Sequence, residues 1–160
     1  MLDDVLKKIA KLNNTISNYQ GKITGANARI TVNQSLANKL ENEIEELRFF
    51  LSTVKNSHQN FNDVLDRKKS VVKEASNINN MDCANEYYQG MTDRLKGIRP
   101  TSTNLLFSSM ESVISAKISG KTTELSVVKA AITADRISIG DWNGIINNAR
   151  RDIKRLKESK

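Results

Sequence analysis

The chain has 160 residues and a formal net charge of +7, with 38% apolar, 27% charged and only 5% aromatic residues. One proline and few aromatic residues argue against a strand-rich sandwich or barrel, because such folds need frequent turns and β-favouring rings. The single cysteine excludes an internal disulfide, the single histidine excludes a multi-histidine metal site, and no apolar run predicts a membrane span.

The first half of the chain carries the strongest pattern. Apolar or small residues recur at alternating steps of three and four from Ile9 to Ala75, which is the repeat of a coiled coil. Only Asn33, His58 and Lys68 interrupt this seam. The pattern predicts one helix over residues 2–76, and another helix must cover its seam.

Two glycines are the weak points of this predicted helix. Gly21 and Gly25 each cost about 1 kcal/mol relative to Ala in a helix interior, so a hairpin turn near Thr24–Asn27 is the alternative. The apolar phase runs through both glycines without a slip, which favours a continuous helix.

An asparagine-rich segment, residues 77–82, predicts the turn that ends this helix, with Asp82 as the N-cap of the next one. We expect breaks at Pro100 and at Gly140. Three further helices are predicted, over residues 83–99, 104–138 and 141–158. Their seam residues are Ala84, Tyr88, Met91, Leu95, Ile98, Phe107, Met110, Ile114, Ile118, Lys121, Leu125, Val128, Ile132, Ile139, Trp142, Ile146, Ala149, Ile153 and Leu156.

These elements predict an all-α fold with no strands. The expected architecture is one domain over residues 1–160, an elongated antiparallel helical hairpin or coiled coil with a very long first helix and a broken returning arm. If that arm covers less than the whole seam, the remaining seam is available to a partner helix. The residues expected to bind such a partner are Ile9, Leu12, Ile16, Tyr19, Ile23, Ile30, Leu40, Ile44, Leu47, Leu51 and Val54.

Few residues are candidates for catalysis or metal binding. His58 reads either as a catalytic or pH-sensitive imidazole or as a polar seam residue that fixes the helix register, and the second reading is favoured. Cys83 has no nearby partner in sequence, and the acidic run from Glu41 to Glu46 is typical of a solvated helix face. No nucleophile, base or metal set converges, so we expect no catalytic residues, no metal site, no cofactor and no enzymatic activity.

The basic C-terminal segment is the remaining candidate. Residues 150–160 carry +4 of the net charge, which predicts either a solvated helix end or salt-dependent nucleic-acid binding. The few aromatic residues and the lack of a binding motif make nucleic acid the weaker interpretation.

The layout resembles a known group of proteins. The segment Leu6–Leu12, the seam from Ile16 to Ile30 and the inter-helix region Met81–Met91 are similar to small α-helical proteins encoded beside LXG-domain toxins in Gram-positive type VII secretion loci, relatives of the WXG-motif hairpins. The family's Trp-x-Gly tripeptide has its counterpart late in the chain. The candidate secretion-related residues are Phe107 and Glu111, an aromatic–acid pair, and Trp142 and Gly144.

The resemblance implies a function. It implies a targeting factor or chaperone that binds the helical N-terminal domain of a cognate secreted toxin, together with a second small helical protein. It also implies a cytoplasmic protein, exported with its partner without a cleaved signal peptide. The alternatives are a self-assembling coiled coil such as a homodimer and, less favoured, a basic nucleic-acid-associated protein.

Overall fold

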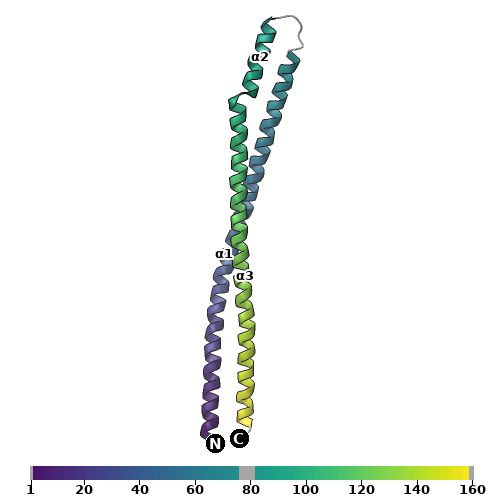
Figure 1. The fold of residues 1–160 in the computed structure, drawn as a ribbon. Helices are drawn as coiled ribbons and strands as arrows, with labels where there is room; N and C mark the ends of the chain where they lie inside the picture. Colours follow the sequence, from purple (N-terminus) through teal and green to yellow (C-terminus); the bar gives the residue numbers. More distant parts are fainter. Residues whose placement is uncertain (1, 76–81, 159–160) are drawn as a thin grey trace. The chain divides into compact units, whose positions relative to one another are not determined.

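The computed structural model describes residues 2–75 and 82–158, and within these ranges it leaves the side chains of Leu2, Ala75 and residues 82–85 undescribed. The described chain is helical. It forms an all-α antiparallel hairpin of α1 (Leu2–Ala75), α2 (Asp82–Lys96) and α3 (Ile98–Glu158) (Figure 1). The predicted fold class is therefore confirmed. The predicted turn over residues 77–82 lies outside the described residues except at Asp82, where α2 begins.

The long first helix is confirmed. Helix α1 runs without a break through Gly21 and Gly25, so the alternative turn near Thr24–Asn27 is wrong. Its seam supplies an apolar or small residue in nearly every turn, and the packing of this seam outweighs the low helix propensity of two exposed glycines.

The predicted breaks in the returning arm are wrong in position or absent. The arm is interrupted at Gly97, before Pro100, and α3 then continues through Gly140 to Glu158. The predicted helices over 83–99, 104–138 and 141–158 are thus replaced by two helices. Pro100 is the third residue of α3, where a backbone N–H has no partner within the helix, so its missing donor costs nothing there.

Gly97 is the place that requires a glycine. A Cβ atom there would lie 2.7 Å from the backbone oxygen of Asp93, a distance that a real side chain does not tolerate. The chain uses this absence of a side chain to let α2 end and α3 begin with one residue between them.

Contacts divide the chain into two compact units. Unit 1 comprises Met1–Asn42 and Thr122–Lys160, and unit 2 comprises Glu43–Lys121. In unit 1, the first part of α1 pairs with the last part of α3. In unit 2, the last part of α1 pairs with α2 and the first part of α3.

Candidate docking surfaces

The residues expected to bind a partner lie in the seam between the helices of their own chain. Leu40, Ile44 and Val54 are buried, and the other described members of this set are partly buried. The returning arm covers this side of α1 along both units. Most of this strip is therefore covered, because the arm extends as far as the seam, and a groove opens only beside Leu12. Binding of a partner by these residues stays a prediction.

The core of unit 1 is a cluster of small and branched apolar residues. Ala37 and Leu40 from α1 pack with Val128 and Ile132 from α3. Ile30 and Leu125, which are partly buried, border the cluster. Burial of each larger side chain contributes about 1.5–3 kcal/mol, so this layer stabilises unit 1.

Ion pairs cross the seam of unit 1 on both sides. Arg29 donates two hydrogen bonds to Asp135, with nitrogen–oxygen distances of 2.5 and 3.2 Å. The Lys129 ammonium lies 2.7 Å from a Glu41 carboxylate oxygen. The hydrogen bonds from Arg29 hold the pKa of Asp135 below its ordinary value, although partial burial acts in the opposite direction.

The seam of unit 2 contains a polar and aromatic cluster around His58. Nδ1 of His58 lies 2.8 Å from a Glu111 carboxylate oxygen and Nε2 lies 3.1 Å from Oδ1 of Asn104. The imidazole stacks on the ring of Phe107 at a centroid distance of 5.0 Å, and Phe61 packs against the same ring. His58 is thus a seam residue with partners on α3, and its role in fixing the helix register stays a prediction.

The candidate secretion-related residues and Cys83 all lie within helices. Phe107 and Glu111 belong to the His58 cluster and are engaged within unit 2. Trp142 is a half-buried seam residue of unit 1, and Gly144 is an exposed position inside α3. Cys83 lies in α2 with its side chain outside the described residues.

The acidic run also contributes to the pairing of the helices. Glu41 pairs with Lys129 in unit 1, and Glu43 pairs with Lys121 in unit 2. Glu45 and Glu46 are exposed. Half of the run therefore forms ion pairs across the seam, and the other half is the solvated face expected from the sequence.

Two expected seam residues of the returning arm are wrong. Ile98 and Met110 are exposed, and Ile98 is 85% exposed. Lys68, which interrupts the predicted seam of α1, is also exposed. In place of Met110, the structure has Glu111 in the seam. From Phe107 to Leu156 the seam of α3 then follows uninterrupted steps of four and three. Its members are Phe107, Glu111, Ile114, Ile118, Lys121, Leu125, Val128, Ile132, Asp135, Ile139, Trp142, Ile146, Ala149, Ile153 and Leu156.

An apolar surface remains beside the seam of unit 2. When the seam residues are taken as heptad positions a and d, six exposed apolar side chains fall at g or the adjacent c positions. In an antiparallel pair, the g positions of both helices lie along one edge of the seam and the e positions along the other. We call this surface the apolar edge of unit 2: Phe50, Val64 and Val71 from α1, and Leu106, Met110 and Val113 from α3.

The opposite edge of unit 2 is polar. Its e positions are Arg48, Lys55, Asn62 and Lys69 on α1 and Thr101, Ser108 and Ser115 on α3. Four exposed apolar residues lie outside the apolar edge. Ile98 and Leu105 are at b positions, next to the e positions, Phe49 is at an f position, and Tyr87 is on α2. Six of the ten exposed large apolar side chains described in unit 2 thus lie on the apolar edge.

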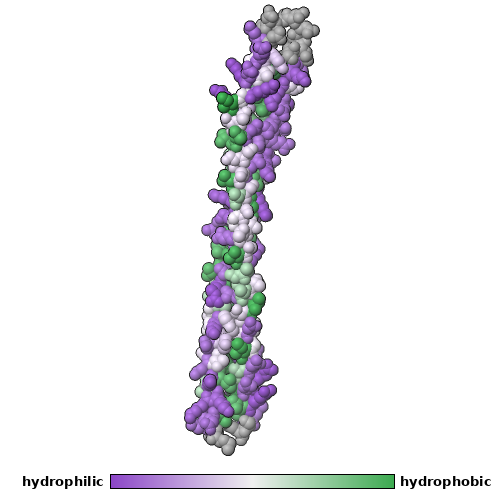
Figure 2. Space-filling model, viewed as in Figure 1, coloured by the Kyte–Doolittle hydropathy of each residue, from purple (hydrophilic) through white to green (hydrophobic). Residues whose placement is uncertain are grey.

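Unit 1 has exposed apolar side chains on both sides of its seam, with Leu6 at an e position and Ile137 at an f position. Val32 and Leu36 from α1 and Val127 and Ile145 from α3 are exposed at c or g positions. Apolar surface appears along α3 between patches of hydrophilic surface in the space-filling view (Figure 2). The sequence contains a signal for the apolar edge of unit 2, because Phe50, Val64 and Val71 are spaced at multiples of seven. Each of these residues directly precedes a residue of the seam, so the stronger seam pattern obscures this signal.

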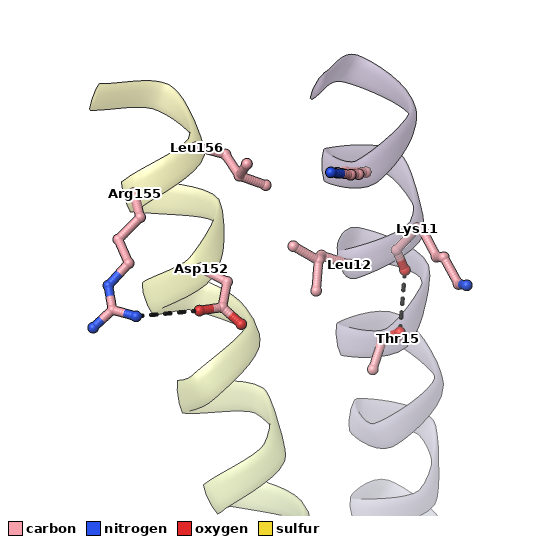
Figure 3. Close-up of a pocket in the computed structure, with 7 residues that line it drawn as sticks. Lys11, Leu12, Thr15, Asp152, Arg155 and Leu156 are labelled. Atoms are coloured by element: carbon pink, nitrogen blue, oxygen red, sulfur yellow. Dashed lines mark hydrogen bonds and ion pairs between the residues drawn. The ribbon is translucent and has the colours of Figure 1, made fainter. Parts of the chain in front are cut away.

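A groove opens between the helices at the end of unit 1 where α1 begins and α3 ends. Its volume is about 480 Å³, and Leu12 and Leu156 point toward one another across it (Figure 3). The remaining lining residues are polar or charged: Lys8, Lys11, Thr15, Asp152 and Arg155.

Among the described residues, no group of three or more His, Cys, Asp or Glu side chains is placed to hold a metal ion. No described helix is both long and apolar enough to cross a membrane.

The fold defines a small all-α protein whose helices pair as an antiparallel hairpin and which carries an exposed apolar edge. Comparisons of the chain with protein-family models, curated proteins and solved structures find no match.

Proposed function

We propose that the chain is a non-enzymatic docking protein that binds a helical segment of another protein along the apolar edge of unit 2. The observation that carries the proposal is the alignment of six exposed large apolar side chains along one edge of a covered seam. A helix laid along this edge adds a third helix to the pair and removes apolar surface from water, which is the helix-in-groove mode of recognition.

The choice of partner rests on the resemblance of the sequence to LXG-toxin-associated proteins. We propose that it is the helical N-terminal domain of a type VII secreted LXG toxin, bound in the cytoplasm. In this role the chain is a targeting factor or chaperone that is exported with the toxin, and a second small helical protein completes the complex. The pairing of Phe107 and Glu111 with His58 inside unit 2 supports a structural use of both residues over a role as a free export signal.

Co-expression with the helical N-terminal domain of an LXG toxin, followed by size exclusion, tests the proposal. The expected result is a stable complex that is lost in the variant Phe50→Glu with Met110→Glu. The matched control, Gln59→Glu with Ser108→Glu, places the same charges on the polar side of unit 2 and retains the complex. Absence of a complex with the unaltered chain contradicts the toxin partner, and equal binding by all three chains contradicts the apolar edge.

Self-association is the alternative occupant of the same edge. Light scattering on the chain alone distinguishes the two, because a docking protein without its partner gives the 17.9 kDa of one chain. Twice that mass, returning to one chain in Phe50→Glu with Met110→Glu, supports the self-assembling coiled coil instead.

A further inference from the structure

The charge of the molecule is concentrated in unit 1. This unit contains fourteen Lys and Arg against eight Asp and Glu, whereas unit 2 contains eleven against ten. Within unit 1 most of the excess lies where α1 begins and α3 ends. The cations there are Lys7, Lys8 and Lys11 on α1 and Arg150, Arg151, Lys154, Arg155 and Lys157 on α3. The acidic residues there are Asp3, Asp4, Asp152 and Glu158, of which Asp3 pairs with Lys7 and Glu158 with Lys154. The groove between Leu12 and Leu156 lies within this cationic region.

The groove itself combines an apolar floor with a cationic rim. Leu12 and Leu156 form the floor, and Lys8, Lys11 and Arg155 are cations of the lining. The side chains of Lys11 and Arg155 extend from the two helices toward the outer sides of the groove (Figure 3). Asp152 is the acidic lining residue, and its carboxylate lies 3.8 Å from a guanidinium nitrogen of Arg155. The charges of these two residues offset each other, so Lys8 and Lys11 supply the net positive charge of the lining. The volume of about 480 Å³ is enough for one large apolar side chain.

We propose that this groove is a second docking site, which takes an apolar anchor residue from an acidic helical segment of another protein. The leucines supply a pocket for the anchor, which carries most of the binding energy at such sites. The rim supplies electrostatic complementarity, which selects carboxylates beside the anchor and raises the association rate. The site shares no residue with the apolar edge of unit 2, so an experiment can contradict this second site without contradicting the proposed function.

Synthetic peptides test the site on the full chain by fluorescence anisotropy. The probe is a labelled helical peptide of about five turns with a leucine stripe flanked by glutamates. Two further probes replace the leucines by serines or the glutamates by lysines. The first probe is expected to bind at least about tenfold more tightly than either of the others, and more weakly as salt is raised.

Protein variants assign the binding to the groove. Leu156→Ser is expected to weaken binding of the first probe about tenfold, and so is the triple variant Lys8→Gln, Lys11→Gln and Arg155→Gln. The matched control neutralises three cations of unit 2, through Arg48→Gln, Lys55→Gln and Lys96→Gln, and is expected to change affinity less than twofold. Circular dichroism checks that every variant keeps its helix content.

Several results would contradict the proposed docking site. One is the absence of binding at peptide concentrations up to millimolar. Equal loss in the groove and control triples shows that only general charge attraction is present, and equal affinity of the serine probe shows that no anchor pocket exists. A short DNA duplex that binds more tightly than the peptide, with affinity unchanged by Leu156→Ser, assigns the cationic end to nucleic acid.

Discussion

At the scale of single residues, the position of a side chain relative to the seam decides whether it supports the fold or faces solvent. Val127 and Val128 are adjacent in α3, yet the first is 63% exposed and the second 8%. Val128 belongs to the core cluster of unit 1, whereas Val127 faces out at a c position. Identical chemistry therefore has different consequences one residue apart.

This pair gives a matched stability test. Val128→Ala is expected to lower the free energy of unfolding by about 1–2.5 kcal/mol, because it removes buried methyl groups and leaves space in the core. Val127→Ala is expected to change it by less than about 0.5 kcal/mol. Urea unfolding measures both, and equal effects would contradict the assignment of the seam.

The Arg29–Asp135 pair predicts a pH dependence. Hydrogen bonds from Arg29 lower the pKa of Asp135 in the folded chain, so the pair stabilises the fold above the ordinary carboxyl pKa of about 3.9. That contribution is lost as the pH falls through the lowered folded value. Asp135→Asn removes it, so the stability difference between the two chains should shrink on acidification below about pH 4. Urea midpoints between about pH 7 and 2.5 test this, and a difference that stays constant with pH contradicts it.

At the scale of elements, the glycines show why a break in a helix is harder to read from sequence than a seam. Pro100 is the expected breaker and is accommodated in the first turn of α3, whereas Gly97 occupies the break. Gly120 lies inside α3 with open space around it. The sequence alone does not distinguish these two glycines, because the difference is the closeness of the Asp93 backbone oxygen to Gly97.

Substitution by alanine is expected to have opposite effects at these two glycines. Gly97→Ala is expected to destabilise unit 2 by about 1–3 kcal/mol, since the new methyl group meets backbone that cannot move freely. Gly120→Ala is expected to stabilise the chain by about 0.5–1 kcal/mol, because Ala favours the helix more than Gly does. Thermal unfolding followed by circular dichroism checks both directions, and stabilisation by Gly97→Ala would contradict the account of the break.

The seam, the helical class and the continuity of α1 were predictable because a repeated apolar period spans many residues and tolerates single exceptions. The start of the seam in α3 was less predictable. The phase moves by one residue near Met110, and only the partners of Glu111 on α1 show which of the two neighbours faces inward. The docking surface could not be placed from the seam pattern, since that pattern does not say whether the covering helix belongs to the same chain.

At the scale of the whole molecule, the central feature is that the returning arm of the chain covers the seam of its own α1. If the seam residues are shared between α1 and α3 of one chain, a partner must use surface beside the seam or a place where the two helices leave the seam open. The apolar edge of unit 2 and the cationic groove of unit 1 are then the available surfaces. If α1 instead pairs with α3 of another copy, the seam itself is the interface between copies.

A single cross-linking measurement decides between these arrangements. Ala37 and Val128 belong to one core cluster, so cysteines at both positions, in a chain with Cys83→Ser, should meet across the seam. The account predicts that oxidation at low protein concentration links them within one chain, which runs as a monomer on a non-reducing gel. Covalent dimers formed in place of that monomer, or no link at all, would contradict it.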